Sequence, residues 1–161
     1  MKKNIKFFEI RNNEEFNDFA IRTFIFQYRN NSIYKKYCDS IGRNLDYVSS
    51  IKDIPYLPII CFKKSKIKSF KGNSKLFFTS SGTTSKNLST HHLNKISNYK
   101  ESFNRCFKSF YGPLEDLTIL ALLPSYLKQK NSSLIFMMNE LINDTKKKES
   151  GFYLYNYEKL S

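Results

Sequence analysis

The chain has 161 residues, of which 40% are hydrophobic and 16% aromatic, so a chain that is disordered by composition is excluded and a folded domain with a core is expected. No apolar run approaches the roughly 20 residues that a membrane span needs. The net charge is +13, but the lysines are spread along the chain, which indicates a compositional bias more than a nucleic-acid-binding face. The densest lysine runs, 63–68 and 146–148, fit solvated turns or strand edges.

The N-terminus and the cysteines give no sign of export or metal binding. The basic residues at positions 2 and 3 are not followed by an apolar segment with a cleavage site, so we expect a cytoplasmic protein. The cysteines, Cys38, Cys61 and Cys106, are odd in number and show no CxxC spacing. We therefore predict neither a disulfide framework nor a metal site.

The first 50 residues predict a helical segment. Apolar residues in 14–29 recur every three or four positions, which is typical of an amphipathic helix. A second helix is expected to begin with Ser32 as its N-cap and to end at Gly42. We expect an N-terminal helical segment over 1–50 and an α/β region over 51–161.

From residue 51 onward the pattern predicts strands that alternate with helices. Strands are expected at 76–79, 117–123 and 152–155, and helices at 93–111 and after Ser132. Such alternation is typical of parallel sheets with right-handed crossovers. The expected fold class is therefore α/β, a mainly parallel sheet with flanking helices. The side chains of the 93–111 helix that we expect to pack on this sheet are Ile96, Phe103, Phe107 and Phe110.

A hydroxyl-rich run follows the strand predicted at 76–79. It reads Thr79-Ser80-Ser81-Gly82-Thr83-Thr84. Backbone N–H and hydroxyl groups in such a loop can donate to phosphate oxygens, and Gly82 permits close approach of the backbone to a ligand. The alternative is a turn whose hydroxyls bond to nearby backbone. The run lacks the G-x-x-x-x-G-K-[ST] pattern of the Walker loop, so an NTPase of that class is not expected.

The run F-T-S-S-G-T-T, followed by Ser89-x-His91, resembles the signature of the LuxE-type acyl-protein synthetases, which belong to the adenylate-forming superfamily. Further phrases resemble this family in the same order. They are D-I-P-Y-L-P at 53–58, Y-G at 111–112, L-L-P-S-Y-L at 122–127, N-S-S-L at 131–134 and G-F-Y-L at 151–154. The resemblance covers about residues 30 to 157.

This resemblance implies an ATP-dependent ligase that activates a fatty acid as an acyl-adenylate and then transfers the acyl group to a protein thiol. The cofactors it implies are ATP and Mg²⁺, with the magnesium ligands outside this chain. The partners it implies are a fatty acid or other carboxylate and an acyl-acceptor protein, with no nucleic acid. It also implies that these residues are a partial N-terminal lobe, truncated relative to the family, which would be an incomplete catalyst by itself. The alternative is a degenerate, non-catalytic α/β module that binds a partner.

The resemblance assigns phosphate binding to the hydroxyl-rich run and to His91, and it identifies no catalytic residue in this chain. The predicted phosphate-binding residues of the run are Thr79, Ser80, Ser81, Gly82, Thr83 and Thr84. His91 could instead be a solvent-facing residue at a helix start, and no acidic residue is tied to it by spacing. Ser125 and Tyr126 end a predicted strand, where α/β folds place ligands, and are candidates for an acyl pocket; the alternative is a turn after Pro124.

Overall fold

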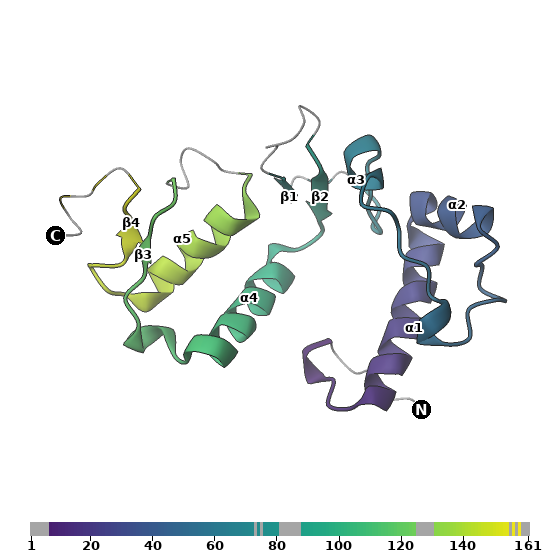
Figure 1. The fold of residues 1–161 in the computed structure, drawn as a ribbon, viewed down its shortest axis with the longest axis horizontal. Coiled ribbons are helices and arrows are strands. Elements are labelled where there is room, and N and C mark those ends of the chain that lie inside the picture. The colour runs from purple at the N-terminus through teal and green to yellow at the C-terminus, as the bar shows by residue number, and fades with distance from the viewer. Residues whose placement is uncertain are drawn as a thin grey trace. The chain divides into compact units, whose positions relative to one another are not determined.

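The computed structural model describes residues 7–72, 74, 76–80, 88–124, 131–154, 156 and 158. Packing divides the chain into two compact units, Met1–Asn73 and Ser74–Ser161 (Figure 1). The organisation into 1–50 and 51–161 stays a prediction. Among the described residues, no helix is long and apolar enough to cross a membrane.

The first unit is built from helices. Its elements are η1 (Phe7–Glu9), α1 (Asn13–Asn30), α2 (Ser32–Ser40), η2 (Ile51–Asp53) and α3 (Cys61–Lys64). The helix predicted at 14–29 is confirmed as α1. The second predicted helix is α2, but its N-cap is Asn31, whose side chain accepts a hydrogen bond from the Tyr34 N–H at 3.1 Å. Gly42 lies just after α2 with φ 67°, a conformation that glycine adopts at low cost, so the helix ends there as predicted.

Aromatic side chains of α1 and α2 form the core of the first unit. Its buried residues are Phe24, Tyr28, Tyr34, Cys38 and Val48. The Tyr34 hydroxyl donates to the Pro55 carbonyl at 2.6 Å and ties the segment after η2 to α2. Burial raises the pKa of the Tyr34 phenol well above its ordinary value. The buried Cys38 thiol also has a raised pKa, mainly because of burial, which suits an inert core residue.

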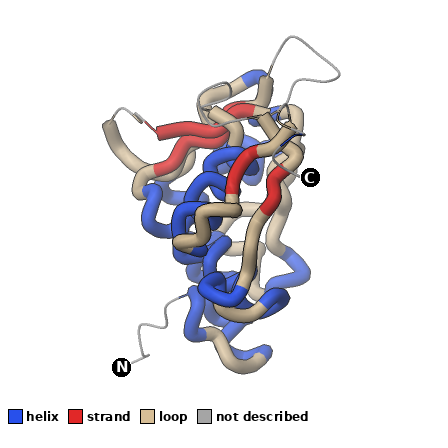
Figure 2. Tube along the Cα trace, turned by 90° about the vertical axis from the view of Figure 1, so that its left-hand side faces the viewer, coloured by secondary structure: helices blue, strands red, loops and turns tan. Residues whose placement is uncertain are grey.

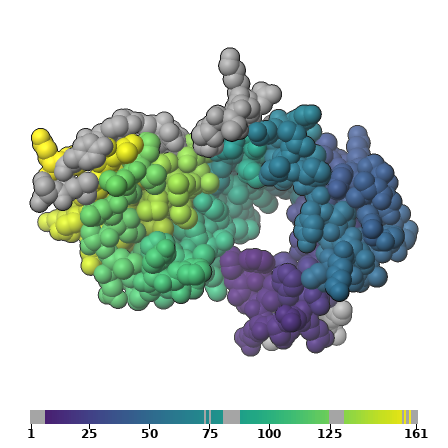
Figure 3. Space-filling model, in the orientation of Figure 1, coloured from purple at the N-terminus to yellow at the C-terminus, as the bar shows by residue number. Residues whose placement is uncertain are grey.

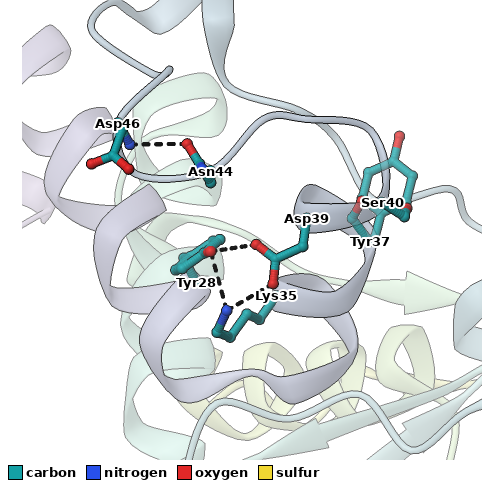
Figure 4. Close-up of polar contacts among 7 residues, drawn as sticks. All are labelled: Tyr28, Lys35, Tyr37, Asp39, Ser40, Asn44 and Asp46. Carbon is teal, nitrogen blue, oxygen red and sulfur yellow. Dashed lines mark hydrogen bonds and ion pairs between the residues drawn. The ribbon is translucent and has the colours of Figure 1, made fainter.

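A polar network on the surface joins the same two helices (Figure 4). Lys35 donates to the Asp39 carboxylate at 2.7 Å and to the Tyr28 hydroxyl at 3.1 Å, and that hydroxyl donates to Asp39. The hydrogen bond from Lys35, and next the one from Tyr28, holds the pKa of Asp39 below its ordinary value. The carboxylate is therefore the form of Asp39 that links α2 to α1.

We predict that acid weakens the link between α1 and α2. Because the pKa of Asp39 is lower in the folded state, its stabilising contribution is present above the pKa of an unfolded aspartate. It is lost as the pH falls through the folded value. The urea midpoint of unfolding should therefore fall between about pH 5 and pH 3, and Asp39→Asn should flatten this dependence. Asp46→Asn removes one acid from the turn after α2 but leaves the network intact, so an equal flattening in that variant would contradict the prediction.

The second unit holds two small sheets, so the expected single, mainly parallel sheet is wrong. Strand β1 (Leu76–Thr79) pairs antiparallel with β2 (Thr90–Leu93), and β3 (Leu120–Ala121) pairs parallel with β4 (Gly151–Phe152). Figure 2 shows the two pairs as separate red segments. The general α/β kind is confirmed, since helices do alternate with strands. The error arose because a strand chooses its partner through long-range contacts, and residues 90–93 offered β1 a closer partner.

The long helices of the second unit are close to their predicted positions. Helix α4 (Ile96–Tyr111) begins three residues later than expected, because residues 90–93 form β2, and Gly112 ends it with φ 83°. Helix α5 (Ser133–Thr145) is capped by Ser132 as expected, since the Ser132 hydroxyl accepts from the Ile135 N–H at 3.3 Å. Local signals of capping and periodicity therefore located both helices.

The core of the second unit gathers around α4 and α5. Its buried hydrophobic residues are Phe103, Ala121, Ile135, Leu141 and Tyr153. The green to yellow residues of this unit form one continuous surface in Figure 3. Two expectations fail here: Phe110 is 78% exposed instead of packed on a sheet, and the 117–123 run is not a fully buried strand, since Leu120 and Leu122 are exposed. Strand β3 alternates between outward and buried residues, as a strand covered on one face does.

Two phenylalanines of α4 provide a direct test of this core. Phe103 is 6% exposed and Phe110 is 78% exposed on the same helix. Phe103→Ala should lower the free energy of unfolding by about 3–5 kcal/mol, because it removes a buried ring and leaves a cavity. Phe110→Ala should change it little, since alanine is the better helix former and no buried contact is lost. Urea unfolding monitored by circular dichroism would measure both, and similar losses would show that this helix packs differently.

Candidate functional site

The hydroxyl-rich run begins at the end of the β1–β2 hairpin. Thr79 is the last residue of β1 and lies opposite Thr90. One residue beyond the strands, the Ser80 N–H donates to the Ser89 carbonyl, and the Ser89 N–H donates to the Ser80 hydroxyl, both at 3.1 Å. These two bonds join Ser80, the second residue of the run, to Ser89, which follows the run in the sequence. The predicted phosphate-binding residues Ser81, Gly82, Thr83 and Thr84 lie outside the described residues.

The end of β1 is also joined to the start of α5. The Thr79 N–H points away from β2 and donates to the Asn131 carbonyl at 2.9 Å. Asn131 immediately precedes Ser132, the N-cap of the 13-residue helix α5. The hydroxyl-rich run therefore starts beside a helix N-terminus, where the aligned peptide dipoles favour negative charge.

An aromatic cluster packs beside the contact between the end of β1 and the start of α5. The centroid of the Phe78 ring lies 5.1 Å from the centroid of the Tyr99 ring on α4 and 5.6 Å from that of the Phe136 ring on α5. Tyr99 also contacts Phe103 at 5.2 Å, and its hydroxyl donates to the Ser133 carbonyl at 3.1 Å. Burial raises the pKa of the Tyr99 phenol, so it stays a neutral donor. Through these contacts β1, α4 and α5 hold the base of the run in one position.

A charged contact supports the same helix pair. The Lys100 ammonium group lies 2.5 Å from the Glu140 carboxylate and 5.7 Å from the centre of the Phe136 ring. Both charged side chains are partly exposed, so the pair adds modest stability. Its place beside Phe136 helps to keep α4 and α5 aligned under the hairpin.

His91 lies in strand β2, directly opposite Phe78. The alternative that it occupies a helix start is wrong, because α4 begins only at Ile96. His91 is exposed and lies two residues after the buried Ser89. A role for His91 in phosphate binding stays a prediction, and the structure places His91 in β2, the strand that pairs with β1.

The acyl-pocket candidates and a possible metal site remain to be considered. Ser125 and Tyr126 lie outside the described residues, and so their assignment to an acyl pocket stays a prediction. In the parts of the chain that the structure describes, no three His, Cys, Asp or Glu side chains gather where they could hold a metal ion.

Two parts of the candidate site, the Asn131 carbonyl and strand β2, were not predicted from the sequence. The Asn131 carbonyl is a backbone group, which no side-chain pattern marks. Strand β2 could have been inferred, since a turn-rich segment between two short runs compatible with β structure is typical of a hairpin. The site is therefore a hairpin end against a helix, and not the expected direct passage from strand through loop to helix.

Comparison with protein families identifies the chain. The model of the family described as acyl-protein synthetase, LuxE, matches residues 3–145. The match covers most of the 161 residues, so this chain belongs to the LuxE acyl-protein synthetase family. The comparisons with curated proteins and with solved structures gave no match.

Proposed function

We propose that this chain supplies the phosphate-binding part of an ATP-dependent acyl-protein synthetase that activates a fatty acid or other carboxylate. The observation that carries the proposal is the position of Thr79 and Ser80. They begin the hydroxyl-rich run between the Ser80–Ser89 hydrogen bonds and the N-terminus of α5. Backbone and hydroxyl donors at such a place suit phosphate oxygens. Membership in the family supports the reaction class.

The charge of the surrounding sequence favours the same ligand. Residues 54–100 contain nine lysines and no Asp or Glu, and they include the whole hydroxyl-rich run and His91. A long acid-free stretch of this kind raises the local concentration of polyanions such as ATP and pyrophosphate. Hydroxyl and N–H donors then select phosphate oxygens at short range.

The proposed chemistry depends on where negative charge develops. When a carboxylate attacks the α-phosphorus of ATP, the bond to the β-phosphate oxygen breaks and pyrophosphate leaves with the bonding electrons. Donors held toward the β- and γ-phosphates stabilise that leaving group. We assign this role to Thr79, Ser80 and the residues at 81–84, with His91 as an additional contact.

The other parts of the proposal rest on the family. Family resemblance implies that Mg²⁺ accompanies ATP. We assign the ion no ligand among the described residues. Ser125 and Tyr126 are proposed to line the acyl pocket. The acceptor is proposed to be a protein thiol, and the location cytoplasmic.

We predict that the chain binds pyrophosphate weakly. A dissociation constant in roughly the millimolar range is expected for a partial site worth about 4 kcal/mol. Ser81→Ala with Thr83→Ala keeps the charge and should remove most or all measurable binding, because each lost donor to a charged oxygen costs about 1.5–3 kcal/mol. Titration calorimetry or NMR shift mapping would measure this.

A matched control separates this site from general attraction to a basic chain. Ser97→Ala with Ser102→Ala removes two hydroxyls from exposed positions of α4 and should leave pyrophosphate affinity unchanged. If both double variants bind equally well, or if NMR shifts spare Thr79, Ser80 and His91, the run is only a turn. A non-catalytic module would then be the better description of the chain.

We also predict that the 161-residue chain alone does not form an acyl-adenylate. The family resemblance also implies a C-terminal lobe with a catalytic lysine and an acyl-accepting cysteine, and the phrases quoted above from this sequence include neither of them. Exchange of labelled pyrophosphate into ATP, tested with fatty acids from short to long, should stay at the level of a buffer control. Exchange clearly above that level would show that residues 1–161 contain a working adenylation site.

A further inference from the structure

A second surface of interest lies in the first unit, in the segment Tyr56–Ile60. Three of its side chains are turned outward: Tyr56 is 82% exposed, Ile59 71% and Ile60 48%. Single exposed apolar residues are common, but three within five residues form a local patch. None of these side chains takes part in the proposed phosphate site.

The segment that carries this patch is firmly held. Ile54 and Leu57 pack on the core of the first unit, and the Pro55 carbonyl accepts the hydrogen bond from Tyr34. Pro55 and Pro58 restrict the backbone further, because each fixes its own φ angle. The backbone that carries Tyr56, Ile59 and Ile60 is therefore held by the fold, and this reduces the backbone ordering that binding requires.

Lysines flank the patch directly. The Cys61 N–H donates to the Pro58 carbonyl at 3.0 Å and the Phe62 N–H donates to the Ile59 carbonyl at 3.1 Å, so the chain turns tightly into α3. Lys64 ends that short helix and Lys66 follows it, and both are exposed. Residues 54–73 contain five lysines and no acidic residue. The sequence alone predicts that these lysines are only solvated. The exposed apolar side chains beside them in the chain indicate a binding surface instead.

We propose that Tyr56, Ile59 and Ile60, together with Lys64 and Lys66, bind the surface of an anionic lipid bilayer. Apolar side chains enter the boundary between headgroups and acyl chains while lysines contact the anionic headgroups. Tyrosine is well suited to that boundary, because its ring is apolar and its hydroxyl is polar. The attachment is peripheral and uses side chains only.

The high exposure of the patch favours a bilayer over an acidic protein. A side chain that is 71–82% exposed has few neighbours beside it, so Tyr56 and Ile59 stand clear of the surface and do not line a groove. A fluid bilayer can take in such side chains one at a time. A protein partner would have to supply a fitted pocket for each of them.

Sedimentation of the full 161-residue chain with lipid vesicles tests the proposal. The chain should bind vesicles of phosphatidylcholine with phosphatidylserine, bind phosphatidylcholine vesicles much less, and be released by salt. Ile59→Ser with Ile60→Ser should weaken binding about tenfold or more, because two apolar side chains no longer enter the bilayer. Leu120→Ser with Leu122→Ser also removes two exposed apolar side chains, from β3 and its neighbour, and should bind normally.

Two matched double variants test how much the lysines contribute to vesicle binding. Lys64→Ser with Lys66→Ser should weaken binding several-fold, while Lys146→Ser with Lys148→Ser removes the same charge from exposed positions after α5 and should not. Equal losses in both pairs, or full binding by the isoleucine variant, would show attraction by net charge alone and overturn the proposal. Absence of vesicle binding together with binding to polyglutamate that needs Ile59 and Ile60 would point to an acidic protein instead. Pyrophosphate titration of the same variants checks that the fold and the phosphate site are intact.

Discussion

The position of the candidate site depends on the packing of one partly buried ring, that of Phe78. A two-stranded hairpin is marginally stable in water and needs a surface to pack on. Phe78 provides this by contacting Tyr99 of α4 and Phe136 of α5, and the Thr79 N–H then reaches the Asn131 carbonyl one residue further along. Because Tyr99 also donates to the first turn of α5, the three elements fix one another. The hydroxyl-rich run is thereby anchored on packed side chains and not on turn preference alone.

The helices were predictable because their signals are local. Periodic apolar residues located α1 and α4 to within a few residues, Ser132 identified the start of α5, and Gly112 identified the end of α4. The remaining errors at helix starts have a simple cause. Asn31, which is buried between α1 and α2, caps α2 in place of Ser32, and the choice between two adjacent capping residues depends on tertiary packing.

The sheets were not predictable in the same way, since an apolar run indicates a strand but not its partner. Leu117 to Leu123 reads as a buried strand, yet only Leu120–Ala121 pairs, and Leu120 faces outward. The site shares this limit. Thr79 and Ser80 were found from their residue types, whereas Asn131 contributes a backbone carbonyl and Ser89 contributes chiefly through its own backbone. Side-chain chemistry is visible in a sequence, and backbone partners become visible only when the chain is folded.

The acid-free stretch from 54 to 100 contains both the hydroxyl-rich run and the Tyr56–Ile60 segment, so charge alone cannot distinguish their ligands. A field of one sign attracts ATP, pyrophosphate and an anionic bilayer alike, and salt weakens all three. The neighbours of the lysines provide the distinction. At Thr79 and Ser80 the chain offers hydroxyl and N–H donors, which match phosphate oxygens. Near Lys64 it offers exposed apolar side chains, which gain nothing from contact with a small hydrated anion. The same excess of lysine can therefore serve two surfaces of different specificity.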